Sequence, residues 1–359
     1  MNKKKIVVAM SGGVDSTTVA AMLKKEGHEV IGITMQLLEY TDAEGGCCGF
    51  DHVVDARRTS EELGIPHYVV NFTDEFKEHV LKDYVNQYES GKTPIPCIPC
   101  NQFVKFDLLL KRAMELGADY LATGHYARVE EENGVYTLNK AVDETKDQTY
   151  FLYTLGQKEL SKLMFPLGDR TKVQVRELAR EFQLRPADKP DSTGVCFAPT
   201  GNYRDYLKAR SEFKESEGEI VNTQGAVLGT HKGVFSYTVG QRRGLGIATG
   251  KPMYVTSIQP VENKVVVGDD NVLYRDKLLA HDIKWVGNTR DNSKLTDILQ
   301  VKAKVRYRHP ASDATITMKS ETDAVVEFTD RQRAITPGQA VVFYSGEKVL
   351  GGGWIEKVI

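Results

Sequence analysis

The stretch Ile6-Val7-Val8-Ala9-Met10-Ser11-Gly12-Gly13-Val14-Asp15-Ser16 decides the fold of the first part of this chain. Its apolar residues predict a strand, and the residues from Ser16 to Glu26 predict a helix. Gly12 and Gly13 can adopt positive φ angles and let the backbone approach a ligand closely. The helix points unpaired N–H groups and the positive end of its dipole toward the same place. This strand, turn and helix therefore predict a phosphate-binding site.

The loop lacks the Gly-Lys-Ser/Thr sequence of a Walker loop, so a kinase or a GTPase fits poorly. Ser-Gly-Gly-Val-Asp-Ser is instead typical of PP-loop ATPases, which split ATP into AMP and pyrophosphate while they adenylate a substrate. We therefore expect the chain to bind ATP and to act through an adenylated substrate.

Composition limits the remaining choices. A chain of 359 residues should hold two or three domains, and 41% apolar and 27% charged residues describe an ordinary soluble protein. The net charge is −2, so binding of nucleic acid would need a local basic patch. No apolar run is long enough to span a membrane, and a strand that begins after Lys5 leaves no room for a signal peptide. We expect a cytoplasmic protein, a monomer, with no membrane partner.

The first 125 residues alternate between predicted strands and helices. After the opening strand we expect strands at Val30–Met35, His67–Asn71 and Tyr120–Thr123, and helices at Val53–Leu63, Thr73–Gln87 and Phe103–Leu116. This alternation is typical of an α/β fold with a doubly wound parallel sheet, whose ligand crevice lies at the carboxyl ends of the strands. Ser11–Ser16, Met35 and Gly124 would meet there. Two further helices are expected at Lys158–Met164 and Lys172–Phe182.

After about residue 205 the pattern changes to short β segments separated by Gly, Asn and Asp. From about residue 278 onward the pattern is entirely β, which predicts a small barrel. We therefore expect a PP-loop nucleotide-binding catalytic domain at 1–205, a small mixed central module at 206–277 and a C-terminal β-barrel at 278–359.

Three of the five cysteines lie in segments rich in Pro and Gly. Cys97 and Cys100 belong to Thr93–Asn101, where three prolines predict a stiff loop between two helices, and Cys196 follows in Lys189–Phe197. The Cys-X-X-Cys spacing is compatible with three interpretations. The thiols can be incidental, they can belong to a metal or iron–sulfur site that needs a further ligand, or they can be catalytic.

An adenylating loop combined with two thiol-bearing loops favours sulfur transfer. Adenylation turns a carbonyl oxygen into a leaving group, and a thiolate or persulfide is a strong nucleophile toward the activated carbon. A second cysteine can release the sulfur by attacking the persulfide, which closes a disulfide. An amide ligase would give the paired thiols no role.

A basic strand is the candidate surface for RNA. Lys302, Lys304, Arg306 and Arg308 alternate with apolar residues, so a strand would place all four cations on one face. Such a face can equally be a solvated surface or protect a sheet edge. The turn Gly240–Gly244 adds two arginines suited to phosphates.

Several motifs occur together as they do in the tRNA-specific 2-thiouridylase family, known in bacteria as MnmA, which the chain resembles from about residue 4 to residue 356. The motifs are Ser11–Ser16, Pro96–Asn101, Ala122–Ala127, Lys146–Leu152, Pro190–Phe197, Tyr237–Gly246, Arg306–Arg308 and Thr336–Ala340. The resemblance implies ATP-dependent replacement of the 2-oxygen of the wobble uridine of tRNA by sulfur, with release of AMP and pyrophosphate. It also implies recognition of the anticodon region and delivery of sulfur by a cysteine-desulfurase relay.

The resemblance further implies a role for individual residues. Cys196 would carry the persulfide, Cys100 would be the nucleophile that frees the sulfur, and the two would end as a transient disulfide. Asp15 would help to hold Mg²⁺. ATP would be bound by Ala9, Met10, Ser11, Gly12, Gly13, Val14, Asp15, Ser16, Met35 and Gly124. The target base would face Ile95, Pro96 and Cys97, although the family commonly has Asn where Ile95 stands. The tRNA would be contacted by His125, Lys146, Asp147, Gln148, Arg306, Tyr307 and Gln339.

Three alternatives stay open at this stage. In the first, Cys97, Cys100 and Cys196 hold a [4Fe–4S] cluster whose open iron binds the sulfide. An ATP-dependent amide ligase would leave the cysteines and the basic strand idle, and a non-catalytic RNA-binding protein would leave the phosphate loop unexplained. For Cys47 and Cys48 we expect packing only.

Overall fold

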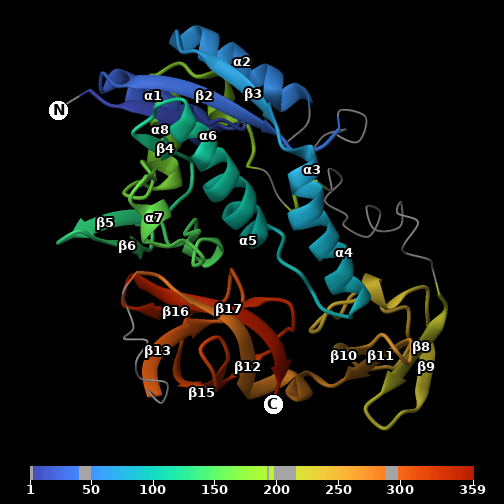
Figure 1. Cartoon of the computed structure of the whole chain (residues 1–359). Coiled ribbons are helices and arrows are strands. Elements are labelled where there is room, and N and C mark those ends of the chain that lie inside the picture. The colour runs from blue at the N-terminus through green and yellow to red at the C-terminus, as the bar shows by residue number, and fades with distance from the viewer. Residues whose placement is uncertain (1–2, 40–49, 192–193, 198–215, 288–297) are drawn as a thin grey trace.

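The computed structural model describes residues 3–39, 50–191, 194–197, 216–287 and 298–359. Cys47, Cys48 and the expected boundary at residue 205 lie outside these ranges. The first unit is a five-stranded sheet flanked by helices, at the top of Figure 1. All four strand pairs are parallel, in the order β3-β2-β1-β4-β7, so the doubly wound parallel sheet is confirmed. The strands are β1 (Lys5–Ala9), β2 (Glu29–Gln36), β3 (His67–Asn71), β4 (Tyr120–Ala122) and β7 (Leu163–Met164).

The central strand β1 is buried on both faces. Val7 packs into one apolar cluster, while Ile6 and Val8 pack into another on the opposite side. Helices cover both faces, as a parallel sheet requires. They are α1 (Val14–Lys25), α2 (Phe50–Leu63), α3 (Thr73–Phe76) continued by η1 (Lys77–Leu81) and α4 (Lys82–Glu89), α5 (Cys97–Pro99) continued by η2 (Cys100–Leu109) and α6 (Leu110–Glu115), α7 (Gln157–Leu160) and α8 (Lys172–Glu181). Short turns of 3₁₀ helix are η3 (Thr149–Phe151), η4 (Arg185–Asp188), η5 (Val234–Ser236) and η6 (Asp270–Leu273).

Two expected helices differ from the structure. The helix expected from Phe103 already begins at Cys97, because a proline in the first turn of a helix removes no hydrogen bond that the helix needs. Cys97 and Cys100 therefore lie in helical turns rather than in a stiff loop. The helix expected over Lys158–Met164 ends at Leu160, and Leu163–Met164 pairs with β4 as the edge strand β7.

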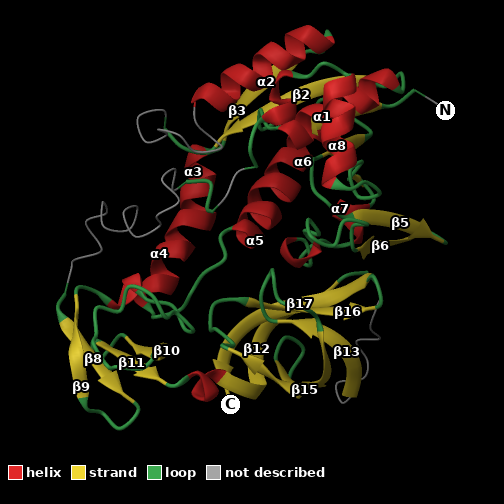
Figure 2. Ribbon diagram, turned by 180° about the vertical axis from the view of Figure 1, so that it is seen from behind, coloured by secondary structure: helices red, strands yellow, loops and turns green. Residues whose placement is uncertain are grey.

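The second unit is a small sheet of mixed direction, as expected for the central module. Its strand order is β10-β11-β8-β9, with β8 and β11 parallel and the other pairs antiparallel. The helix that continues from α3 into α4 runs from the parallel sheet toward this module (Figures 1 and 2). The strands are β8 (Gly218–Asn222), β9 (Val227–His231), β10 (Tyr254–Gln259) and β11 (Lys264–Gly268).

The third unit is the expected antiparallel barrel. Six strands follow the order β12-β15-β14-β13-β16-β17, and pairing between β12 and β17 closes the barrel. A hairpin of the first unit, β5 (Arg128–Glu132) and β6 (Val135–Asn139), extends the same sheet at β17 and was not expected from the sequence. The barrel strands are β12 (Tyr274–Trp285), β13 (Ile298–Lys304), β14 (Ser312–Met318), β15 (Ala324–Arg333), β16 (Ala340–Ser345) and β17 (Lys348–Val358).

The expected basic face of the barrel is wrong in its second half. Strand β13 ends at Lys304, so Arg306 and Arg308 follow in a turn and do not continue its alternation. Arg306 is half-buried, and its guanidinium donates to the carbonyl oxygens of Arg333 and Ala334 at 2.7 and 3.0 Å. Lys302 pairs with Asp313 at 2.9 Å. Among the described helices of all three units, none is long and apolar enough to cross a membrane.

Gly12 is required by its surroundings. Its φ of +70° lies in the left-handed region, and a Cβ there would collide with the carbonyl oxygen of His52 in α2. Gly27, at the end of α1, has a φ of +90°, but a Cβ at this position would meet no atom within 4 Å. Alanine substitutions at these two glycines therefore distinguish the cost of a strained backbone from the cost of a steric collision.

We predict that Gly12→Ala lowers the free energy of unfolding more than Gly27→Ala does. Gly27→Ala should cost only the left-handed conformation, about 1–2 kcal/mol. Gly12→Ala adds a collision with backbone that cannot yield without moving α2. Urea unfolding of both variants measures the difference, and equal losses would contradict this account of the loop.

Candidate active site

The phosphate loop, Met35, Gly124 and three cysteines line one cavity of about 320 Å³ at the carboxyl edge of the parallel sheet. The segments that contribute lie up to 188 positions apart, between Ala9 and Phe197. The described lining residues are Ala9, Met10, Ser11, Asp15, Ser16, Thr34, Met35, Leu37, Phe76, Val80, Pro96, Cys97, Cys100, Asn101, Lys105, Thr123, Gly124, His125, Gln148, Phe151, Gly194, Cys196 and Phe197. The structure thus brings the expected nucleotide and thiol residues together, except that Gly12, Gly13 and Val14 are not among the lining residues.

The start of α1 is built to receive an anion. In the described loop its N-cap, Gly13, is extended and no side chain caps the helix. The Ser16 hydroxyl accepts from the Ser11 backbone N–H at 3.1 Å, which holds the turn closed. Gly124 lets the segment after β4 approach this helix end, since a Cβ there would lie 3.0 Å from Asp15 Cβ and from Ser16 N. Uncapped amides at a helix N-terminus favour phosphate.

Asp15 is held by partners that the sequence did not reveal. Both of its carboxylate oxygens accept from Lys172 Nζ at 2.7 Å, and Oδ1 also accepts from the Tyr126 hydroxyl at 2.9 Å. Mg²⁺ that arrives with a nucleotide usually takes one or two carboxylates and several phosphate oxygens. Asp15 is the only acid in the described lining, so it would share its charge between Lys172 and such an ion.

Cys97, Cys100 and Cys196 are all in the thiol form. Cys100 is 7% exposed, and burial raises the pKa of its thiol to about 12. Cys97 is accessible from within the cavity but is surrounded by protein, which together with the nearby thiols of Cys196 and Cys100 raises its pKa to about 12. Cys196 is held by the next residue, because the buried ring of Phe197 packs edge-on against Phe76 and Tyr84.

Lys105 is a residue of this cavity that the sequence did not single out. It is the only lysine or arginine in the described lining, and its charge opposes the rise in the pKa of Cys100. The segment Cys100–Leu109 is a π-helix, whose hydrogen bonds join residues five apart, so Lys105 returns to the face of Cys100. The periodicity of an ordinary α-helix would have placed it elsewhere.

The described residues do not form a ready metal centre. Within the described ranges no three His, Cys, Asp or Glu side chains are grouped so that they could hold a metal ion, and this includes the three thiols of the cavity. This finding concerns a single metal ion; the three thiols that a [4Fe–4S] cluster would need all line the same cavity.

The candidate tRNA residues of the first unit fall into two groups. His125 and Gln148 line the cavity, and burial, with help from the Lys105 charge, lowers the pKa of His125 well below its ordinary value, so the imidazole is neutral at pH 7. Asp147 is instead buried and accepts hydrogen bonds from Thr149 and the Ala141 backbone. Lys146 Nζ lies 2.8 Å from Asp191, outside the lining.

The barrel reaches the cavity through two of its candidate residues. The Tyr307 ring lies 4.4 Å from that of Phe151, which lines the cavity. The Gln339 amide donates to the Thr93 carbonyl at 2.8 Å, and the Thr93 N–H donates to Pro337 at 2.9 Å. The barrel therefore holds the segment that precedes Ile95 and Pro96.

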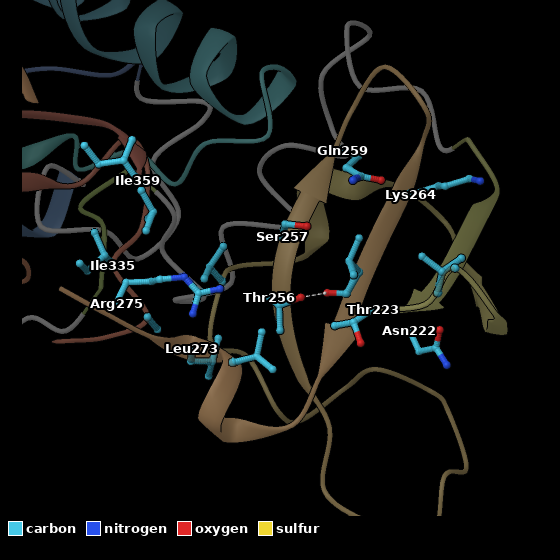
Figure 3. A pocket seen from close by; sticks show the side chains of 17 residues that line it. Asn222, Thr223, Thr256, Ser257, Gln259, Lys264, Leu273, Arg275, Ile335 and Ile359 are labelled. Atoms are coloured by element: carbon cyan, nitrogen blue, oxygen red, sulfur yellow. Dashed lines mark hydrogen bonds between the residues drawn. The ribbon is translucent and has the colours of Figure 1, made fainter. Parts of the chain in front are cut away.

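A second, larger cavity of about 590 Å³ lies between the central module and the barrel (Figure 3). Neutral polar side chains such as Asn222, Thr256 and Gln259 line it, with Lys264 and Arg275 as its cations. Its described lining contains no cysteine or histidine. Because it holds neither the phosphate loop nor a thiol, we place the chemistry in the smaller cavity.

A parallel sheet with an ATP-type phosphate loop and thiols in the same cavity defines an adenylating enzyme of the PP-loop class. Family models match along the chain: the tRNA methyl transferase HUP domain at residues 4–200, the tRNA methyl transferase PRC-barrel domain at 204–269 and the Aminomethyltransferase beta-barrel domain at 275–355. The chain is 48% identical to the tRNA-specific 2-thiouridylase MnmA of Geotalea uraniireducens, over 99% of this chain and 96% of that protein. It is also 48% identical to the protein of the same name from Clostridium acetobutylicum, over 99% and 100%. The chain belongs to the tRNA-specific 2-thiouridylase family.

One solved structure illustrates how far the likeness in three dimensions extends. A 4-thiouridine synthetase–RNA complex with bound ATP matches 57% of this chain and 50% of that chain, at 21% identity and a TM-score of 0.34. This likeness is too weak to carry an argument about function.

We predict that alkylation of Cys100 by iodoacetamide rises about tenfold for each pH unit between pH 7 and 10, because only the thiolate reacts and the raised pKa keeps the thiol protonated. Lys105→Met should slow alkylation further at every pH, since it removes the nearby positive charge. Lys111→Met, an exposed lysine of the same helix, is the matched control. Mass spectrometry of the Cys100 peptide gives the rates. A flat pH profile, or equal rates in the two variants, would refute this description of the thiol.

Proposed function

We propose that this chain makes 2-thiouridine at the wobble position of tRNA, as a tRNA-uridine 2-sulfurtransferase. The curated relatives carry the name 2-thiouridylase, whereas the family models carry the name methyl transferase. The observation that decides for sulfur transfer is the cavity in which the phosphate loop faces three thiols. Transfer of a methyl group would need neither an adenylating loop nor paired thiols.

Adenylation is the first step of the proposed reaction. The 2-oxygen of the uridine attacks the α-phosphorus of ATP, the bond to the β-phosphate oxygen breaks, and pyrophosphate leaves. The uncapped start of α1 faces the phosphates, and Mg²⁺ bound with the nucleotide would add charge neutralisation beside Asp15. The product is an AMP ester at C2, which is open to a sulfur nucleophile.

Sulfur transfer is the second step. Cys196 carries a persulfide received from a cysteine-desulfurase relay, and the Cys100 sulfur attacks the Cys196 sulfur. The Cys100–Cys196 disulfide forms, the terminal sulfur leaves as hydrosulfide and adds to C2, and AMP departs. An external dithiol then reduces the disulfide. Because the pKa of Cys100 is raised, its proton passes to the terminal sulfur of the ionised persulfide as the attack occurs, and the Lys105 charge favours the thiolate character that develops on Cys100.

The substrate base must leave its stack to reach this cavity, as enzymes that modify bases generally require. We propose that Ile95, Pro96 and Cys97 face the base, with His125 and Gln148 close by as neutral hydrogen-bonding groups. Lys146, Tyr307 and the basic turn Gly240–Gly244 support contacts to the anticodon region. Asp147, Arg306 and Gln339 are engaged within the protein, so their contribution would be to shape this surface.

We predict that Cys100→Ser and Cys196→Ser each abolish 2-thiouridine formation while ATP binding stays within about twofold of the unmodified protein, since neither thiol belongs to the phosphate loop. Cys97→Ser is the matched control, because it removes a third thiol of the same cavity. Thiolation is measured by mass spectrometry of tRNA nucleosides with a persulfide donor.

Two results would contradict the persulfide route. Full turnover by Cys100→Ser or Cys196→Ser would remove the proposed pair from the reaction. Loss of turnover in Cys97→Ser, together with stoichiometric iron and sulfide in anaerobically purified protein, would favour a three-cysteine cluster instead.

A further inference from the structure

Lys172 joins two parts of the active site that are far apart in the sequence. Its side chain, 11% exposed, donates to both carboxylate oxygens of Asp15 at 2.7 Å and lies 2.9 Å from Asp191 Oδ1. Asp15 belongs to the phosphate loop, and Asp191 precedes Cys196 by five residues. The three N–H donors of one ammonium group therefore tie the nucleotide side of the site to the sulfur side.

The backbone of Lys172 is fixed as well. It is the first residue of α8, whose N-terminus is capped by Thr171 and Gln174, and its N–H donates to Asp143 at 2.9 Å. Helix α8 packs against α1, which carries Asp15. The ammonium group also lies 5.8 Å over the Tyr126 ring. Lys172 is thus held in place from both ends, as a positioning residue must be.

Two further cationic side chains form ion pairs with Asp191. Lys146 Nζ lies 2.8 Å from its Oδ2, and an Arg176 nitrogen lies 3.0 Å from its Oδ1. Three cations, Lys146, Lys172 and Arg176, thus lie among the carboxylates of Asp15, Asp191 and Asp143, so the charges of the cluster balance beside the phosphate loop. Since Lys146 is also a candidate tRNA contact, the cluster adjoins all three parts of the proposed reaction.

We propose that Lys172 is a positioning residue that couples nucleotide binding at the phosphate loop to the reactivity of Cys196. This role rests on the proposed function, in which Cys196 carries the sulfur. Phosphate oxygens that arrive at the loop compete with Asp191 for the donors of the same ammonium group, which loosens the hold on Asp191. Cys196 then becomes more reactive when nucleotide is bound. By linkage, a change at Asp191 alters nucleotide affinity in return.

The test measures alkylation of Cys196 relative to Cys100 with and without a non-hydrolysable ATP analogue. Cys100 lines the same cavity but lies on η2, whereas the described bonds of the Lys172 side chain run to Asp15 and Asp191, so the ratio cancels simple shielding by the nucleotide. We expect the analogue to raise the ratio at least about fivefold in the unmodified protein, in the range of ordinary coupling between sites. The ratio should not respond in Lys172→Met or Asp191→Asn, and Lys172→Arg should restore the response.

Several comparisons make the test decisive. Lys251→Met, which removes an exposed ion pair with Asp269 in the central module, should respond like the unmodified protein. If Lys172→Met does not fold, Asp191→Asn decides, because it leaves the contact between Lys172 and Asp15 intact. A nucleotide response that survives in both variants, or that is missing in the unmodified protein, would overturn the coupling. Failure of the unmodified protein to thiolate tRNA would instead overturn the proposed function, because the alkylation ratio does not depend on turnover.

Discussion

The active site depends on one constraint: the carboxyl ends of β1, β2 and β4 meet at the same edge of a parallel sheet. The loop after β1 brings the uncapped start of α1 to that edge, the end of β2 brings Met35, and the segment after β4 brings Gly124. Once this edge exists, any segment that crosses it shares a cavity with the nucleotide. The helix that begins at Cys97 and the segment that carries Cys196 and Phe197 both do so.

The barrel contributes more than a surface. Its turn at Pro337–Gln339 bonds to Thr93 on both the N–H and the carbonyl side, and Gly338 leaves just enough space for Lys92 and Thr93. Tyr307 packs on Phe151 at the cavity wall. The third unit therefore braces the segment that we propose to face the target base.

Local signals in the sequence predicted the phosphate loop, the parallel sheet and the barrel, because each depends on residues close together in the chain. The predictions from local signals failed where the position of a residue depends on a partner that is distant in the sequence. Three prolines suggested a loop at Cys97, but Pro94 and Pro96 precede the helix and Pro99 lies in its first turn, where it is tolerated. Arg306 was expected to point outward with Lys302, yet its guanidinium donates hydrogen bonds to two backbone carbonyls and is half-buried. Lys172 gave no signal, since its partner Asp15 lies 157 residues earlier.

The central claim is that Cys100 and Cys196 meet in the nucleotide cavity, and disulfide trapping tests it most directly. The protein is oxidised briefly with diamide in the presence of an ATP analogue, then alkylated and digested without reduction, and linked peptides are identified by mass spectrometry. We expect the peptide pair that contains Cys100 and Cys196 to dominate. Loss of both thiols without this pair, with Cys100 linked only to Cys97 or to another molecule, would contradict it.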